Sequence, residues 1–448
     1  MRTQKNPFWK RLLYTTQPPA DATSRVRQVL NNAVLHLHPT YVPISALRFT
    51  YTWGLGGTSA ALALLLGLTG ILLMFQYDPS IERAYLSIQK IETQVVFGSL
   101  VRGIHHWSAN LLVVSTFLHL LRVFFTGGYK KKRTTNWLIG LFLLTLVLAS
   151  NFTGYLLPWD QLAYWAVTVS TSLLSYIPIL GKEISNFFLG GSTVGQGTLR
   201  NFYAFHVAFL PVLTTAMMGY HFWKIRKNGG ISQPEEAEAR QTERVTTIPH
   251  LTSRELSILI FVIVVILLMG MWLPTPLEEI ANPNQSPNPA KAAWYFLGLQ
   301  ELLLHMDPLA AILLVGTVFF GMVLIPLWDN RGENIGIYFR SKTGRRVALF
   351  NTILAIDLIP LLVIADEYWF NLPDLFPNVS PFVGSGIIPL AITFAGLLMI
   401  YLLSRLVFKA NHSEGLLGVF TFTMVSLLVL TLIGNFFRGI NMALVLPF

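Results

Sequence analysis

Nine apolar stretches constrain the fold of this chain more than any other feature. Each is close to the ~20 residues that an α-helix needs to cross the hydrocarbon core of a bilayer. They lie at residues 53–76, 105–125, 137–157, 202–223, 256–273, 309–328, 347–365, 386–404 and 416–436. Only 12% of the residues are charged, whereas soluble proteins carry about 25%. The sequence therefore predicts an all-α polytopic membrane protein.

The basic residues predict how the chain sits in the membrane. If the N-terminus lies inside, 25 of the 32 Lys and Arg residues fall in inside segments. This asymmetry predicts a cytoplasmic N-terminus. The formal charge of +10 is then mostly a topology signal, and we expect no nucleic-acid partner. Residues 25–43 resemble a short amphipathic helix on the membrane surface.

The loops divide the chain into parts. Two long outer loops, 158–201 and 274–308, are rich in Trp, Tyr, Pro and Gly, and we expect short helices there that cap a site. The predicted parts are an N-terminal segment (1–50), a four-helix domain (51–230), a linker (231–254), a C-terminal half (255–370) and extra membrane helices (371–448).

Five of the ten histidines lie inside two of the apolar stretches, and four of them form widely spaced pairs. His105 and His119 are 14 residues apart in the second span, and His206 and His221 are 15 apart in the fourth. These spacings correspond to about 21 and 22 Å along a helix. Fourteen residues is nearly four turns, whereas fifteen adds about 100° of rotation, which we expect Pro211 to adjust.

The histidines pair by depth, because both spans run from outside to inside in the predicted topology. His105 and His206 lie at the outer level, and His119 and His221 lie at the inner level. Two imidazoles can ligate one haem iron from opposite sides. The pattern therefore predicts a four-helix bundle that holds two haems stacked across the membrane.

Glycines in the other two helices repeat the same period. Gly56 and Gly70 are 14 residues apart in the first span, and Gly140 and Gly154 are 14 apart in the third. Glycine lets a flat group approach the backbone closely. Glycines in spans are more often helix-packing sites, and a lone membrane histidine is more often a packed residue. The matched registers favour haem binding over both alternatives.

Other polar residues near these spans receive weaker interpretations. Arg102 and Arg122 each lie three residues from a candidate ligand, and we expect them to pair with haem propionates. His106 points about 100° away from His105 and is interpreted as structural. The remaining histidines carry no signal: His36, His38, His250, His305 and His412.

Several segments resemble the cytochrome b subunit of quinol-oxidising bc and b6f complexes. They are RGIHHWSAN…FLHLLRVF, TGYLLPWDQLAYWAV, GGSTVGQGTLRNFYAFH and HFWKIRKNGGIS. The resemblance covers about residues 40–330. The 15-residue spacing and the PWDQ sequence are most similar to the b6 type, although both halves are fused here as in mitochondrial-type cytochrome b.

This resemblance implies a transmembrane dihaem cytochrome b of a quinol:cytochrome c, or other acceptor, oxidoreductase. Quinol would be oxidised at the outer face, with one electron passing to a Rieske iron–sulfur protein and one to the outer haem. Electrons would then reach quinone at the inner face, and a proton gradient would form. The resemblance also implies two non-covalent haem b groups, a c-type cytochrome subunit, a homodimeric complex and the cell's inner membrane.

The resemblance also implies where quinol would bind. Segments 158–166 and 289–301 would form the outer pocket. Its expected lining residues are Tyr155, Pro158, Trp159, Ala166 and Trp294.

The chain departs from the family at this pocket. The family usually carries Pro-Glu-Trp-Tyr, whereas residues 292–295 are Ala-Ala-Trp-Tyr, so the usual acidic proton acceptor is replaced by Ala293. The candidate replacements are Tyr295, Glu301 and Asp160. Glu301 lies eight residues further on, about 12 Å along a helix, and a structural role for this acid stays open beside the catalytic one.

A second departure concerns an additional haem. The b6-type chains hold it through a cysteine in the first span, and the matching residue here is Gly54. The chain has no cysteine, so no covalent haem can form on it. A non-covalent third haem stays open.

The C-terminal part resembles the family less. The ninth span goes beyond the usual eight, and we expect it either to dock a partner or to face lipid. Asp357, inside the seventh span, is costly in lipid and is expected to face a proton path or a partner's polar group. The alternative function is a dihaem membrane anchor that links quinol to a peripheral dehydrogenase or reductase; a transporter with a histidine proton relay is the third.

Overall fold

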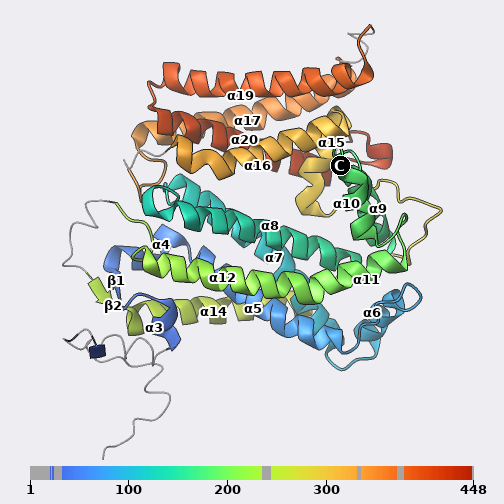
Figure 1. The fold of residues 1–448 in the computed structure, drawn as a ribbon, viewed down its shortest axis with the longest axis horizontal. Helices are drawn as coiled ribbons and strands as arrows, with labels where there is room; N and C mark the ends of the chain where they lie inside the picture. Colours follow the sequence, from blue (N-terminus) through green and yellow to red (C-terminus); the bar gives the residue numbers. More distant parts are fainter. Residues whose placement is uncertain are drawn as a thin grey trace, which may run out of the picture.

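The nine predicted spans are all present as helices in a computed structural model of the chain (Figure 1). It describes residues 21, 23–24, 33–234, 244–329, 334–370 and 378–445. The spans are α5 (Leu55–Met74), α7 (Gly98–Phe125), α8 (Thr134–Leu156), α11, η3 and α12 together (Gln196–Lys227), α14 (Thr247–Trp272), α16 (Pro308–Trp328), α17 (Lys342–Tyr368), η5 with α19 (Val383–Val407) and α20 (His412–Phe436). The all-α class is confirmed.

Short elements connect the spans. They are α3 (Ala33–Leu37), β1 (Tyr41–Pro43), η1 (Ile44–Leu47), α4 (Phe49–Thr52), α6 (Ala84–Thr93), η2 (Lys131–Arg133), α9 (Gln161–Leu174), α10 (Gly181–Leu189), β2 (Arg244–Thr246), η4 (Trp294–Phe296), α15 (Leu297–His305) and η6 (Ile440–Met442). The short helices expected in both outer loops are present as α9, α10 and α15. Residues 25–32 of the predicted amphipathic segment 25–43 lie outside the described residues, and the rest contains α3 and β1.

The two halves pack as two layers of helices (Figure 1). In the N-terminal layer, α5, α7, α8 and α14 share an apolar core made of Ala61, Leu62, Leu112, Val113, Val147, Val262 and Ile266. Helix α14 therefore packs on the four-helix bundle although it follows the predicted linker. Gly103 of α7 allows this contact, because a Cβ there would lie 2.8 Å from the carbonyl oxygen of Gly270 in α14.

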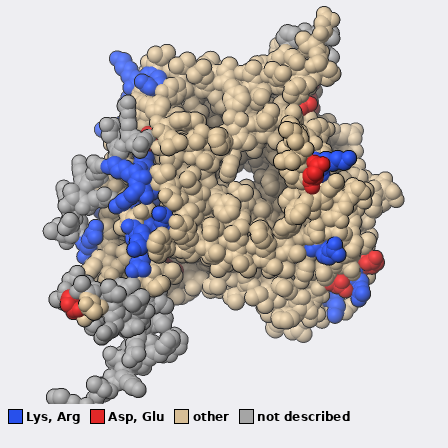
Figure 2. All heavy atoms as spheres, in the orientation of Figure 1, with Lys and Arg blue, Asp and Glu red and all other residues tan. Residues whose placement is uncertain are grey.

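Strands β1 and β2 also join the first half to the second. Tyr41 pairs with Thr246 in an antiparallel two-stranded sheet. Figure 2 shows Lys and Arg gathered on the side of the molecule where this sheet lies, while the opposite side carries both acidic and basic residues. The charge distribution agrees with the predicted asymmetry between the two membrane faces.

A buried charge cluster connects the halves on the same side. Asp329, just after α16, forms an ion pair with Lys130 at 2.9 Å, and both side chains are about 1% exposed. The Asp329 carboxylate also accepts hydrogen bonds from Tyr129 at 2.5 Å and Ser413 at 2.9 Å. Arg340 donates to the Tyr129 hydroxyl at 3.0 Å. The loop after α7 is thereby fixed to the ends of α16 and α20.

The ninth span, α20, packs on α15, α17 and α19 and also exposes apolar side chains such as Leu428 and Leu432, so both of its expected roles stay predictions. It is the most buried of the spans in the described chain. Its residues Val429, Leu430 and Ile433 form a core with Val363 of α17 and with Leu302 of α15. Sequence hydropathy did not separate it from the other spans, because a buried helix and a lipid-facing helix are equally apolar.

Asp357 lies on the exposed surface of α17, with no hydrogen-bond or ion-pair partner in the described part of the chain. Its exposed neighbours on the helix include Ile353 and Leu361. The structure therefore places this carboxylate on an apolar outer face, which leaves both predicted roles as predictions.

Candidate functional site

The two outer-level histidines face each other. His105 of α7 and His206 of η3 have ring centroids 6.1 Å apart, with the ring planes at 73°. His206 Nδ1 donates to the carbonyl oxygen of Ser150 at 3.0 Å, and His105 Nδ1 lies 2.9 Å from the Thr69 hydroxyl. A carbonyl can only accept, so the His206 proton is on Nδ1 and Nε2 is left as a free ligand atom.

Each predicted glycine lies against the ring of a candidate ligand. A Cβ at Gly70 would lie 3.3 Å from His105 Cε1, and one at Gly154 would lie 2.5 Å from His206 Cε1. The inner level repeats the arrangement: the corresponding distances are 3.4 Å for Gly56 and His119, and 3.7 Å for Gly140 and His221. The glycines of α5 and α8 thus leave room for the imidazoles of α7 and of the fourth span, at both levels.

One wide helical turn explains how a 15-residue spacing keeps His206 and His221 on one face. Residues Phe205–Phe209 form a π-helical turn, in which Leu210 N–H donates to the carbonyl oxygen of Phe205. Such a turn holds an additional residue and therefore takes up the surplus rotation. Pro211, which follows directly, has no N–H to donate to the preceding turn. The π turn next to Pro211 adjusts the rotation, and the expectation that Pro211 itself does so stays a prediction.

At the inner level, the ring nitrogen His221 Nδ1 is buried without a hydrogen-bond partner among the described residues. A buried polar atom of this kind costs free energy unless another group satisfies it. The four imidazoles lie in two pairs at two depths, and a glycine leaves room beside each ring. Together with the free Nε2 of His206, this arrangement fits two flat metal-containing macrocycles, one at each depth.

The two arginines predicted to meet propionates have different surroundings. Arg102 forms an ion pair with Glu92 and donates to the carbonyl oxygen of Pro276 at 2.8 Å. Arg122 donates through Nε to the carbonyl oxygen of Tyr51 at 3.2 Å, and its Nη2 is buried without a partner in the described chain. Arg122 thus keeps one N–H donor without a protein partner in the described chain, whereas the guanidinium of Arg102 already binds protein groups.

Comparison with known proteins identifies the bundle. Residues 41–229 match the family described as Cytochrome b/b6/petB. Cytochrome b6 of Heliobacterium modesticaldum is 42% identical over 197 residues, which are 44% of this chain and 90% of that protein. The chain belongs to the cytochrome b/b6 family. Cytochrome b6 of Porphyra purpurea is 44% identical over 180 residues, covering 40% of this chain and 83% of that protein.

The fold likeness extends beyond the cytochrome b6 region. A chain of a solved structure described as a hyperthermophilic respiratory Complex III matches with a TM-score of 0.62 and 21% identity. The match covers 86% of this chain and 91% of that chain. The C-terminal layer therefore shares its fold with that structure, in addition to the four-helix bundle that cytochrome b6 proteins share.

The two outer loops of this cytochrome b family member meet each other. Asp160 caps α9 by accepting from Ala163 N–H at 2.9 Å and also accepts from Glu278 N–H at 3.2 Å in the second loop. Gln161 N–H donates to the carbonyl oxygen of Glu279 at 2.8 Å. Burial raises the pKa of the Asp160 carboxyl, although the two backbone donors act against it. Asp160 therefore holds the two loops together.

The other predicted lining residues lie around these contacts. Tyr155 is near the end of α8, Pro158 and Trp159 occupy the turn into α9, and Ala166 lies on α9. Trp159 is only 6% exposed, in an apolar cluster that also contains Leu156. The first loop is thus brought against the second.

The Ala-Ala-Trp-Tyr segment borders the same region. Ala293 is 7% exposed, and the Trp294 indole N–H donates to Asn110 Oδ1 at 2.6 Å. The Tyr295 hydroxyl is buried with no hydrogen-bond partner in the described residues. Burial, and to a lesser degree the nearby Tyr155, raise the pKa of Tyr295. This hydroxyl is therefore protonated and available to a ligand.

Glu301 is not placed as a free proton acceptor. Its side chain is 0% exposed, and Arg438 Nη2 lies 2.5 Å from its Oε1. His305 Nε2 lies 3.3 Å from the same oxygen. Burial alone would raise the pKa of Glu301, but the bonds from His305 and Arg438 outweigh burial and lower it. The structure favours the structural role of this acid over the catalytic one.

Sequence reasoning missed His305 and Arg438. His305, assigned no signal, bridges Glu301 and Asp366, whose Oδ2 lies 2.7 Å from His305 Nδ1. The i, i+4 spacing of Glu301 and His305 is a signal that was available. Arg438, by contrast, is 137 residues from Glu301 in sequence, so no local pattern could reveal this pair.

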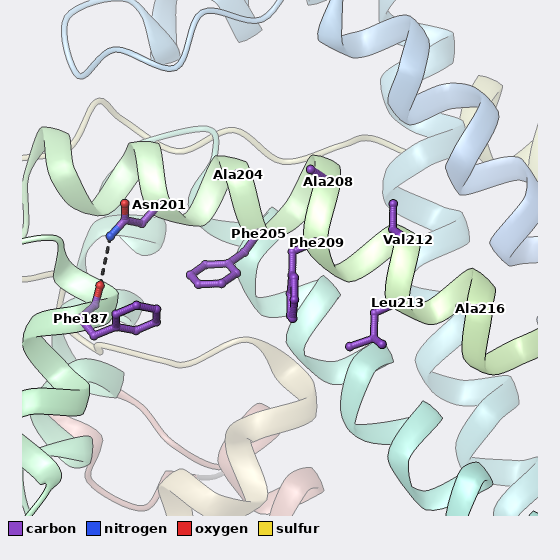
Figure 3. Close-up of a pocket in the computed structure, with 9 residues that line it drawn as sticks. All are labelled: Phe187, Asn201, Ala204, Phe205, Ala208, Phe209, Val212, Leu213 and Ala216. Atoms are coloured by element: carbon purple, nitrogen blue, oxygen red, sulfur yellow. Dashed lines mark hydrogen bonds between the residues drawn. The ribbon is translucent and has the colours of Figure 1, made fainter.

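One cavity of about 680 Å³ opens beside the fourth span. Figure 3 shows Phe205, Phe209 and Phe187 around it, with Asn201 donating to the carbonyl oxygen of Phe187 at 3.1 Å. Its other lining residues are Ala204, Ala208, Val212, Leu213 and Ala216. The lining is almost wholly apolar, and Phe209 and Val212 are more than half exposed, so this surface suits hydrocarbon chains of lipid.

Proposed function

We propose that this chain is the dihaem cytochrome b subunit of a quinol-oxidising membrane complex. The observation that carries the proposal is the facing pair His105 and His206, with Gly70 and Gly154 against their rings. The same arrangement at the inner level supports a second site for His119 and His221. Two non-covalent haem b groups held there would supply one-electron redox centres at two depths.

The chain's own residues have definable roles at these sites. The carbonyl of Ser150 orients the His206 ring and fixes its tautomer, since it accepts the Nδ1 proton. The Thr69 hydroxyl donates to the carbonyl oxygen of Leu65 at 2.7 Å, so its oxygen accepts the Nδ1 proton of His105 and orients that ring. Arg122 offers a buried N–H to a carboxylate of a bound group. The contacts of Ser150 and Thr69 orient the two outer-level imidazoles before any group binds.

The outer loops support a quinol-oxidation pocket in the region of Tyr155, Asp160 and residues 292–295. Oxidation of a quinol releases two protons and two electrons, so the pocket needs proton acceptors. Asp160, with its raised pKa, is the candidate acceptor that the geometry favours, and the protonated Tyr295 hydroxyl is a hydrogen-bond donor for a bound quinol. Glu301 is already ion-paired.

The remaining parts of the proposal follow from the resemblance and the family. One electron would leave to a Rieske iron–sulfur protein and then to a c-type cytochrome, and quinone would be reduced near the inner face. The complex would be a homodimer in the inner membrane with a cytoplasmic N-terminus, as the basic residues indicate. The two long outer loops contact each other through Asp160 and Gln161. These loops favour this function over the dihaem membrane anchor, which needs no pocket there.

The test is quinol-dependent reduction in the gently purified complex. We expect that quinol reduces the haems, and that electron paramagnetic resonance detects a Rieske centre in the same preparation. An active complex without a Rieske signal would favour the membrane anchor. A different result would contradict quinol oxidation by this chain: dithionite reduces the haems, but no quinol tested reduces them, whatever its headgroup.

A further inference from the structure

A hairpin follows α20 and contacts Asn288 and Glu301. After α20, residues 437–445 fold back on themselves: Val445 N–H donates to the carbonyl oxygen of Phe437 at 2.9 Å, and Gly439 N–H donates to that of Ala443 at 3.0 Å. We call residues 437–445 the C-terminal hairpin. Phe437 and Leu444 pack against the core that α15, α17 and α20 share. The hairpin is therefore an ordered part of the C-terminal layer.

Arg438 is the charged centre of this hairpin. Its guanidinium donates to Glu301 through Nε at 3.0 Å and Nη2 at 2.5 Å, and through Nη1 to Glu367 at 2.5 Å. Nη1 also donates to the carbonyl oxygen of Met442 at 2.8 Å. Arg438 is 4% exposed. One side chain thus ties α15, the end of α17 and the hairpin together.

Helix α15 passes this constraint to the pocket segment. Gln300, next to Glu301, accepts from Ala292 N–H at 2.7 Å and donates to the carbonyl oxygen of Ala290 at 2.6 Å. The backbone of residues 290–292 is therefore fixed to α15 directly before Ala293. Any movement of α15 would move the pocket segment with it.

The approach of α15 to α20 is also close. A Cβ at Gly298 of α15 would lie 2.7 Å from the Thr431 hydroxyl of α20. A Cβ at Gly434 of α20 would lie 3.1 Å from Leu297 Cβ. Each helix thus contributes a glycine where the other approaches, so α20 acts as a fixed support for α15.

The rim of the same segment is tied to the C-terminus independently of Arg438. Asn288 donates to Asn441 Oδ1 at 2.7 Å, and Asn441 N–H donates back to Asn288 Oδ1 at 2.6 Å. Lys291 Nζ donates to the carbonyl oxygen of Asn435 at 2.9 Å. Both sides of the pocket segment, 288–291 and 297–305, therefore contact the end of the chain.

We propose that the C-terminal hairpin is a positioning element of the quinol-oxidation pocket, with Arg438 as its central positioning residue. The inference rests on the proposed function for the identity of the pocket. It gives the ninth helix a role within this chain: α20 brings the hairpin to the outer face, where it holds α15 and residues 288–295 in place. Displacing a binding group by about 1 Å can lower turnover by about a hundredfold, so loss of this positioning should show in the kinetics with quinol.

The test uses the full chain in its complex and exploits the lack of cysteine. A single cysteine is introduced by Ala292→Cys, and its maleimide labelling rate is measured with and without Arg438→Lys or Asn288→Ala. The matched controls are Arg405→Lys, at an exposed arginine of α19, and Asn284→Ala, at an exposed asparagine of the same loop. The KM for quinol and the turnover rate per haem are measured for the same four substitutions in the cysteine-free chain.

We expect Arg438→Lys to raise both the labelling rate and the quinol KM by about tenfold, and Asn288→Ala to raise them by a smaller factor, while haem content per chain stays constant. Labelling rates that equal those of the controls in both variants would overturn the positioning role. If labelling responds while quinol fails to reduce even the unsubstituted complex, the proposed function has failed and the assignment of the hairpin to a quinol pocket falls with it. Because Asn288 is on the rim, its variant tests the proposal even if Arg438→Lys fails to fold.

Discussion

Gly154 faces His206 so closely that a Cβ on the glycine would lie 2.5 Å from the imidazole Cε1. Real Cβ atoms do not approach other heavy atoms to this distance. The glycine therefore sets where the His206 ring can lie, and the same holds, less tightly, for the other three pairs of glycine and histidine. This relationship connects two helices whose matching periods are visible in the sequence.

Gly154→Ala should displace His206 and weaken binding of the outer haem. We expect haem content to fall towards one per chain, with the inner haem retained. The control is Gly219→Ala in α12, where an added Cβ meets nothing within 4 Å. Pyridine haemochrome analysis of the purified variants measures the ratio. Full occupancy of both sites in Gly154→Ala would contradict the role assigned to this glycine.

Tyr295→Phe removes a buried hydroxyl that has no partner in the described chain. We expect little change in stability, because no protein hydrogen bond is lost. Quinol oxidation should fall by about tenfold or more, since a ligand loses its hydrogen-bonding group. Steady-state rates per haem test this against Tyr176→Phe, at an exposed tyrosine of the first outer loop. Equal rates in the two variants would contradict a role for the Tyr295 hydroxyl in binding quinol.

The charge state of His305 predicts how stability depends on pH. Burial lowers the pKa of His305, but the carboxylates of Asp366 and Glu301 outweigh burial and raise it from 6.5 to about 9. The stabilisation, at most about 3 kcal/mol, is therefore complete below pH 6.5 and is lost as the pH rises to about 9. Thermal unfolding should show this loss in the original chain and not in His305→Gln. If the unfolding temperature of both proteins changes equally with pH, the His305 ring is not charged in the folded protein.

Asp329→Asn should destabilise the junction between the two halves. The substitution takes the carboxylate away from Lys130 in a site where both side chains are about 1% exposed. Removing one partner of a buried pair typically costs about 3–5 kcal/mol. We expect a lower midpoint for the thermal loss of haem absorbance. Asp357→Asn, at an exposed carboxylate of α17, is the matched control, and an equal midpoint in both variants would contradict the role of Asp329.

The sequence predicted the spans, the histidine pairs and the four glycines, because each depends on a period within one helix. His206 and His221 lie on one face only because of a π turn, and one wide turn leaves no repeating pattern. The Glu301–Arg438 pair and the central place of α20 depend on contacts between segments far apart in the chain. Hydropathy is alike for a span that faces lipid and one that packs on protein, so these features required the structure.

The haem-to-chain ratio, together with the reduced-minus-oxidised spectrum, tests the central claim most directly. We predict a b-type spectrum with two haems per chain, one haem in His206→Leu and one in His221→Leu, with the remaining haem spectrally different in the two variants. His250→Leu, at an exposed histidine near the start of α14, should retain both. The absence of a b-type band, or the retention of both haems in His206→Leu, would contradict the pairing of His105 with His206 and of His119 with His221.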